Sequence, residues 1–198
     1  MNITVLTKSY PPPPVNEREI LRYARCGNPD EETERLLKGC IFEASEALSY
    51  RVCYAELPAV INGSHCDFGA FELNSEKLSK NLSGCDRAVI FAATVGSGID
   101  RLITKYSRIS PAKSVMLQAI GAERVEALCD AFCDDIEKEY QTKAKSRFSP
   151  GYGDVPLLIQ KNFFAVLECE KRIGAVLNEN LFMSPSKSVT AFIGLPKK

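Results

Sequence analysis

The sequence has no excess of either charge, because its 25 lysines and arginines balance 25 aspartates and glutamates. Proteins that bind the phosphate backbone of nucleic acids usually carry a clustered basic surplus, so the composition argues against that class. The chain also lacks any run of 18 or more apolar residues, the length that suggests a membrane-spanning helix. Its first residues lack the basic start of a signal peptide. We therefore expect a cytoplasmic protein that binds neither nucleic acid nor membrane.

Metal-site signatures are scarce as well, because the chain has one histidine and no C-x-x-C spacing. Cys129 and Cys133 could form a two-thiolate half-site on one helix face, with His65 and Cys66 as the other candidate cluster, but zinc usually takes four ligands. Disulfide frameworks are typical of short secreted chains. We therefore expect reduced cysteines that pack as small apolar side chains. The eight cysteines are at positions 26, 40, 53, 66, 85, 129, 133 and 169.

The chain does have the length and apolar content of one globular domain, with 198 residues and 45% hydrophobic side chains. Asn16 is the expected N-cap of the first helix, four prolines at 11–14 predict an extended connector, and Asn62-Gly63 predicts a turn. Helices are expected at 17–24, 30–48, 75–82, from about 99, at 112–144 and at 157–177 with a break near Gly174. Strands are expected at 2–6, 51–57, 67–73 and 88–95, with a hairpin of 181–183 and 188–193. Because strands and helices do not alternate regularly, we expect an α+β fold, a mixed or antiparallel twisted sheet with flanking helices.

The long helix contains one carboxylate in a lane of small side chains. Such a lane would let a ligand approach Glu126 closely. A charged residue on a helix is more often solvated or paired with a basic side chain, here Arg124 or Lys138, and this interpretation is favoured from the residues alone. The lane, at steps of three and four, is Ala119, Ala122, Glu126, Cys129 and Cys133.

Gly96-Ser97-Gly98 follows the expected buried strand and precedes a helix, where nucleotide-binding folds place a glycine turn. A third glycine in register and a second strand ending in an acidic residue are missing. A simple strand-to-helix turn, in which Gly96 adopts a positive φ, is the better interpretation.

The segment Arg147–Pro156 is a second candidate site. Glycines 151 and 153 let a ligand approach the main chain, and prolines 150 and 156 stiffen the loop. Arg147 offers a fork of donors that suits a carboxylate, and Tyr152 offers a ring face and a hydroxyl. These groups suit a small ligand with an amino acid end and an aromatic base, although an ordered loop without a ligand explains them equally well.

At this loop the sequence resembles a known family. Arg147-x-x-x-Gly151-Tyr152 resembles the S-adenosylmethionine-binding motif of the activation domain of vitamin B12-dependent methionine synthase, in its stand-alone version. The likeness implies one domain over 1–198, with an N-terminal arm and first helix at 1–30 and the best-matching core at 86–195. The other similar segments are Phe91–Gly96, Ala119–Ala127, Ile173–Asn180, Met183–Pro185 and Lys187–Ala191.

The resemblance also implies the roles of the site residues. Glu126 would hold the ammonium and Arg147 the carboxylate of S-adenosylmethionine. The backbone of Ser149, Pro150 and Gly151 would meet the adenosine, and Tyr152 would lie near the reacting methyl group and the corrin. The chain departs from the family in two places: the tyrosine of the last strand falls on Ile193, and the aspartate near the domain start has no clear match.

The implied reaction is reductive methylation. Cob(II)alamin on a cobalamin-binding methionine synthase core takes an electron, in many bacteria from flavodoxin, and the reduced cobalt takes the methyl group. Cobalt is then the nucleophile, so we expect no catalytic side chain. Two other functions remain open. The chain could be a non-enzymatic interaction subunit of a corrinoid protein that has lost the ligand, or a nucleotide-fold methyltransferase that uses Gly96 and Gly98 and needs a parallel sheet.

Overall fold

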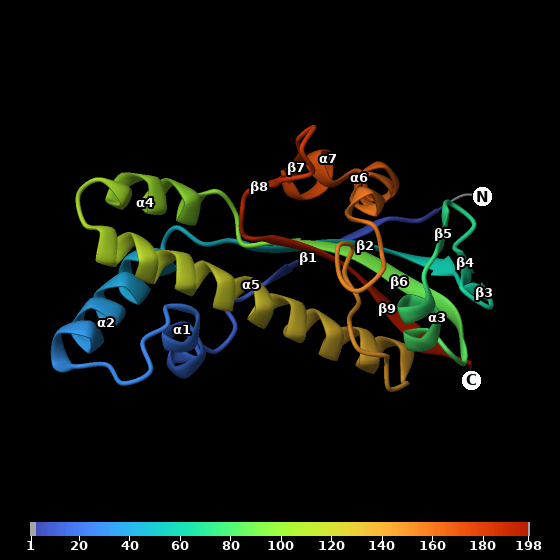
Figure 1. Cartoon of the computed structure of the whole chain (residues 1–198), viewed down its shortest axis with the longest axis horizontal. Coiled ribbons are helices and arrows are strands. Elements are labelled where there is room, and N and C mark those ends of the chain that lie inside the picture. Colours follow the sequence, from blue (N-terminus) through green and yellow to red (C-terminus); the bar gives the residue numbers. More distant parts are fainter. Residues whose placement is uncertain (1–2, 198) are drawn as a thin grey trace.

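Four antiparallel strands form the central sheet of the computed structural model, which describes residues 3–197 (Figure 1). Their order is β1-β2-β6-β9, so β1 and β9 lie at the two edges. All three ladders of this sheet are antiparallel. This confirms the predicted α+β class and excludes the parallel sheet that the methyltransferase alternative needs. The strands are β1 (Leu6–Tyr10), β2 (Tyr50–Pro58), β6 (Cys85–Thr94) and β9 (Ser188–Pro196).

One face of the sheet packs against a layer of helices. Alternate side chains of a strand point to opposite faces, and on this face Tyr54 and Phe91 enclose the ring of Phe132, with ring centroids 5.0 and 4.8 Å from it. The longest helix, α5, runs along the length of the sheet (Figure 1). The helices of this layer are α1 (Glu17–Tyr23), α2 (Glu31–Ser45), α4 (Gly98–Ser107) and α5 (Pro111–Tyr140).

The opposite face has its own apolar core. Phe192 of β9 packs between Phe68 and Phe163, with ring centroids 4.9 and 4.8 Å away. This layer combines short helices with a small antiparallel sheet of order β3-β4-β5. Its elements, and the short ladder beside it, are β3 (Val60–Asn62), β4 (His65–Asp67), β5 (Glu72–Asn74), α3 (Glu76–Asn81), the 3-10 helix Leu157–Ile159, α6 (Gln160–Leu167), α7 (Cys169–Ile173), β7 (Val176–Leu177) and β8 (Met183–Ser184).

A buried ion pair on α5 fixes the proline connector that follows β1. Arg124 and Glu123 are 2% and 4% exposed and bind each other. The Arg124 guanidinium also donates to the carbonyls of Pro13 and Pro14, at 2.6 and 2.7 Å. Glu123 accepts a hydrogen bond from the backbone N–H of Asn16 at 3.1 Å. The pair therefore provides hydrogen-bond partners for backbone groups of the arm, whose prolines have no N–H with which to form a strand ladder.

The predicted N-cap at Asn16 is confirmed. The side chains of Asn16, Asp30 and Ser75 each accept a hydrogen bond from a backbone N–H in the first turn of the following helix. The three helices that follow them were expected and are present within three residues of the expected ends. The strands expected at 51–57 and 88–95 are also present, as β2 and β6, and Gly96 has the expected positive φ of 81°.

Two predicted strands are wrong in position. The strand expected at 2–6 begins only at Leu6 and continues to the prolines, because its ladder with β2 extends that far; residue 2 lies outside the described residues. The strand expected at 67–73 is interrupted where Gly69, with φ 73°, donates its N–H to the Asp67 side chain at 2.7 Å. The chain reverses there, so β4 pairs with β5. The Asn62-Gly63 turn joins β3 to β4 instead.

Three further predictions are wrong in extent or pairing. The long helix ends at Tyr140 rather than 144, because Gln141 has a left-handed backbone with φ 51°. The helix expected at 157–177 does break at Gly174, as predicted, but it also breaks at Glu168, with φ 50°, and residues 176–177 are a strand. The hairpin of 181–183 and 188–193 does not form. β8 pairs with β7, and β9 pairs with β6, which offers a much longer apolar ladder.

The close packing of the turn before α4 leads to a prediction about stability. A side-chain carbon on Gly98 would lie 2.8 Å from the carbonyl carbon of Ala47 and closer still to its oxygen. Gly98→Ala should therefore lower the free energy of unfolding by ~1–3 kcal/mol, measured by urea denaturation. The matched control is Gly39→Ala in α2, where nothing lies within 4 Å and helix propensity should add ~0.5–1 kcal/mol. Equal stability of the two variants would contradict this packing.

Candidate functional site

The candidate site lies at the free edge of β9, where the chain passes from α5 to α6. Residues 145–148 run beside β9. Lys145 N–H donates to Gly194 at 2.9 Å, and Phe148 and Phe192 exchange backbone hydrogen bonds of 3.0 and 2.8 Å. Phe148 is 8% exposed and packs in the core on the α6 face. Because neighbouring side chains of an extended segment point to opposite sides, Arg147 turns toward α5.

Arg147 meets two carboxylates of α5. Its Nη2 lies 3.2 Å from Oε2 of Glu126 and 2.6 Å from Oδ1 of Asp130. The Arg147 side chain is 23% exposed, and those of Glu126 and Asp130 are 44% and 70% exposed. The structure thus brings together the two residues that the resemblance pairs. Of the two partners suggested from the residues alone, Arg124 or Lys138, Arg124 binds Glu123 in the interior instead.

The small-residue lane beside Glu126 supplies two thiols near the guanidinium. Burial raises the pKa of the Cys129 thiol and raises that of Cys133 to about 11, so both are neutral at physiological pH. They add no negative charge to the site. Asp130 was not among the predicted residues, although its i, i+4 spacing from Glu126 places both on one helix face.

The loop after Arg147 is held by hydrogen bonds between its own backbone groups. Gly151 N–H donates to Val155 at 2.9 Å, and Tyr152 N–H donates to Ser149 at 3.1 Å. Gly151 has φ 84°, and a side-chain carbon there would lie 2.9 Å from Leu157. The predicted loop at 151–153 is therefore confirmed, with its backbone held in one conformation. Ser149, Pro150, Gly151 and Tyr152 all follow Arg147 at this edge of the sheet.

The Tyr152 side chain projects from the loop and is largely exposed. Its ring packs edge-on against Phe148, with centroids 5.6 Å apart, but the residue is 69% exposed. Leu157 and Leu158 follow it at 42% and 56% exposure. Large apolar side chains that share one segment and remain exposed are typical of a surface that contacts a ligand or a partner.

Asp154 anchors the loop from its other side, a role that the sequence analysis missed. Its carboxylate accepts hydrogen bonds from the Ser75 hydroxyl and from the backbone N–H of Glu76 at 2.8 Å. Lys77 N–H lies 3.4 Å from it. These donors are the first N–H groups of α3, which attract an anion. The sequence predicts a helix that begins at Ser75, but no local pattern identifies an acid so far along the chain as its partner.

The Asp154 anchor predicts a pH dependence. The hydrogen bond from Ser75, with those from the helix N–H groups, holds the pKa of Asp154 below its ordinary 3.8. A carboxyl with a depressed folded-state pKa adds stability above its unfolded pKa, and this stability is lost as the pH falls through the folded value. Asp154→Asn should therefore lower the Tm by a constant amount near neutral pH, and the difference from wild type should shrink as the pH falls below 3.8 and vanish below the folded-state pKa. Asp134→Asn, an exposed acid of α5, is the control. A wild-type advantage that grows with acid would contradict the anchor.

The glycine turn at 96–98 packs closely against Ser49 and Ala47. A side-chain carbon on Gly96 would lie against the Ser49 hydroxyl, and one on Gly98 against the Ala47 carbonyl. The Gly96 N–H already donates to Thr94 Oγ1 at 3.2 Å. With the antiparallel sheet, this rejects the nucleotide-fold methyltransferase interpretation. Within residues 3–197, no three His, Cys, Asp or Glu side chains are grouped to hold a metal ion.

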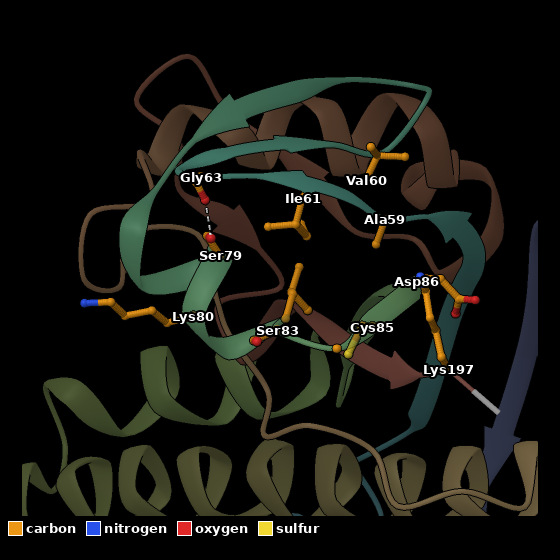
Figure 2. Close-up of a pocket in the computed structure, with 12 residues that line it drawn as sticks. Ala59, Val60, Ile61, Gly63, Ser79, Lys80, Ser83, Cys85, Asp86 and Lys197 are labelled. Carbon is orange, nitrogen blue, oxygen red and sulfur yellow. Dashed lines mark hydrogen bonds between the residues drawn. The ribbon is translucent and has the colours of Figure 1, made fainter.

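A separate groove lies between β3 and the turn from α3 to β6 (Figure 2). It measures about 760 Å³ and is lined by both apolar and charged residues, among them Ile61, Lys80, Asp86 and Lys197. It contains none of the predicted binding residues. No helix of the described chain combines the length and apolarity required to cross a membrane.

Comparison with known proteins bears on the region of Arg147 and Glu126. A sequence model of the family described as "Vitamin B12 dependent methionine synthase, activation domain" matches residues 78–197. The search of curated proteins gave no match. The crystal structure of the MetH reactivation domain bound to AdoHcy is similar, with a TM-score of 0.71, 16% identity, and coverage of 97% of this chain and 78% of that one. At this identity the structural likeness shows a shared fold. Because the sequence match spans more than half of the chain, the protein belongs to the family of vitamin B12-dependent methionine synthase activation domains.

Proposed function

We propose that this chain binds S-adenosylmethionine at the β9 edge and supports reductive methylation of cob(II)alamin on a separate methionine synthase core. The observation that carries the proposal is the meeting of Arg147 and Glu126, at 3.2 Å, inside the family-matched region. The whole of 1–198 would act as one activation domain in the cytoplasm, with residues 1–30 as its arm and first helix and residues 86–195 as the ligand-binding core.

The side chains at the edge fit the amino acid end of this ligand. Both ion pairs of Arg147 use Nη2, so Nε and Nη1 make no ion pair within the described chain. Either can donate to a ligand carboxylate, and the paired geometry that a guanidinium favours would combine one of them with Nη2. Glu126, beside it and 44% exposed, can accept from an ammonium. A zwitterion would therefore find both complementary charges within one side-chain length.

The loop fits the other end of the ligand. The left-handed Gly151 lets an adenine approach the main chain of Ser149, Pro150 and Gly151, where a Cβ would obstruct the loop. The exposed ring of Tyr152 would lie over the sulfonium methyl group and face the corrin. These residues bind the ligand, orient its methyl group outward and shield it from water.

The cobalamin carried by the partner would supply the nucleophilic metal, and flavodoxin is the proposed electron donor. No side chain of this chain is assigned as an acid, base or nucleophile, because the methyl transfer needs orientation and not proton transfer. Its role is that of a methyltransferase component in methionine biosynthesis.

Calorimetric titration with S-adenosylmethionine tests the binding step. Wild type should bind, and Glu126→Gln should bind ~10-fold more weakly, since a charge-assisted hydrogen bond to the ammonium is replaced by a neutral one. A cobalamin-dependent methionine synthase without an activation domain should then regain methionine formation when this chain, S-adenosylmethionine and reduced flavodoxin are added. Absence of binding, with and without the corrinoid partner, would overturn the proposal.

A second function is favoured by one observation. Ile193, at the position of the family's tyrosine, is fully buried and pairs with Val89. It cannot offer a hydroxyl to a ligand, while the exposed Tyr152, Leu157 and Leu158 still present a docking surface. A non-enzymatic interaction subunit would bind the corrinoid protein without responding to S-adenosylmethionine. Complex formation with no heat of ligand binding would select this function.

A further inference from the structure

Two buried thiols meet between the sheet and α7, away from the Arg147 edge. Cys53 lies in the middle of β2, and Cys169 is the first residue of α7. Their Sγ atoms are 3.9 Å apart, within reach of an S–H···S hydrogen bond. Cys53 is 0% and Cys169 1% exposed, and both belong to the core on the α6 face. The pair spans two segments far apart in the chain, so a bond between them would join β2 to α7.

Two arginines lie near this pair in the sequence, and the charge of one of them, Arg172, acts on Cys53. Arg51 precedes Cys53 by two residues on β2 and therefore shares its face of the sheet. Arg172 follows Cys169 by one helical turn. The Nε atoms of both arginines are buried without a hydrogen-bond partner within the described residues. Positive charge at a thiol favours its thiolate form.

The two thiols differ in acidity. The pKa of Cys53 is lowered because the Cys169 S–H can donate to its thiolate; burial opposes this effect, and the charge of Arg172 adds to it. The same contact and burial raise the pKa of Cys169. Cys53 is therefore the thiol that ionises first, and Cys169 is the second, resolving thiol.

An open cavity borders the Cys169 side of the pair. Cys169 lines an open cavity of about 630 Å³, together with Phe164, Glu168 and Val176. α7 has five residues and is bounded by two left-handed positions, Glu168 with φ 50° and Gly174 with φ 71°. Short helices between such bends are held by few backbone hydrogen bonds. Opening of α7 would expose both sulfur atoms from the cavity side.

We propose that Cys53 and Cys169 form a modification site at which hydrogen peroxide oxidises the two thiols to a disulfide. The Cys53 thiolate attacks one peroxide oxygen, the O–O bond breaks, and hydroxide leaves with its electron pair. The resulting sulfenic acid is attacked by the Cys169 sulfur, so that the S–O bond breaks, the S–S bond forms and a second hydroxide leaves. The two thiol protons convert both hydroxides to water. Both sulfur atoms are oxidised, and both peroxide oxygens are reduced.

The test is peptide mapping of the native wild-type chain after treatment with hydrogen peroxide. Free thiols are alkylated in acid before digestion, so that disulfides do not exchange during unfolding. We expect a linked peptide that contains Cys53 and Cys169 and weighs about 2 Da less than the two reduced peptides together. Recovery of both cysteines as alkylated thiols, whether or not other cysteines react, would overturn the proposal.

A second measurement tests which of the two thiols is oxidised first, with a control for the effect of replacing a core cysteine. In Cys169→Ser the resolving thiol is absent, so a cyclic 1,3-diketone should trap a sulfenic acid on Cys53. Cys66→Ser, another fully buried cysteine of the same core, is the control and should still give the linked peptide. Trapping on Cys169 in Cys53→Ser, with none on Cys53 in Cys169→Ser, would overturn the assigned order.

Discussion

Replacing Arg147 by alanine should weaken the binding of S-adenosylmethionine by ~30–150-fold, equivalent to ~2–3 kcal/mol. The substitution removes the donor fork that the proposal assigns to the ligand carboxylate. It also leaves Glu126 and Asp130, now without their cation, next to that carboxylate. The lost attraction and the added repulsion both weaken binding of the ligand carboxylate. Titration calorimetry at fixed ionic strength measures the effect, because these side chains are partly exposed and salt screens them.

Two further variants test whether the loss of affinity is specific to the Arg147 guanidinium. Arg147→Lys keeps the charge but loses the paired donor geometry, so it should restore only part of the affinity. Arg35→Ala removes an arginine that also pairs with a carboxylate, Glu31, on the distant helix α2, and should bind like wild type. If Arg147→Ala binds as tightly as Arg35→Ala, the β9 edge is not the ligand site.

Arg124→Ala should cause the largest loss of stability, ~3–5 kcal/mol or a fall in Tm of ~10 °C. The substitution leaves the Glu123 carboxylate buried without its partner, and it removes the donors to Pro13 and Pro14. The arm that contains these prolines should detach from α5. Thermal unfolding followed by circular dichroism measures the Tm.

The matched control for this variant is Arg22→Ala. Arg22 also binds a neighbouring glutamate, Glu19, at 2.8 Å, but its side chain is 61% exposed. Exposed ion pairs contribute little to stability, because water and salt screen both charges. A loss for Arg124→Ala no larger than that for Arg22→Ala would show that the interior pair does not hold the arm.

The features that the sequence predicts well depend on neighbours in the chain. The predicted N-cap at Asn16 is a hydrogen bond to the next turn of backbone, so a short pattern is sufficient to find it. The apolar run that becomes β6 predicts a strand buried on both faces, as the structure shows. The α+β class follows from the irregular order of such elements.

The features that were missed depend on partners far along the chain. The hairpin expected near the C-terminus gives way to pairing of β9 with β6, because a long apolar strand buries more surface than a local turn does. The helix breaks at Gln141 and Glu168 occur at residues without a glycine or proline signal. Packing against the sheet determines where these helices break, and the periodicity of the sequence does not reveal the break positions.

The site was predicted only in part for the same reason. Composition and spacing identify the Arg147 loop and the lane around Glu126 as separate features, and only the family resemblance joined them. The fold brings them together at 3.2 Å through the extended run of residues 145–148. Asp130 and the loop anchor Asp154 were missed, since their partners lie on other elements.

The structure of this chain crystallised with S-adenosylmethionine tests the central claim most directly. We expect the ligand carboxylate within hydrogen-bond distance of Arg147, its ammonium at Glu126, and its adenosine along residues 149–151. A ligand bound elsewhere, for example in the groove between β3 and α3 or at the glycine turn 96–98, would contradict it. So would an unchanged β9 edge at saturating ligand.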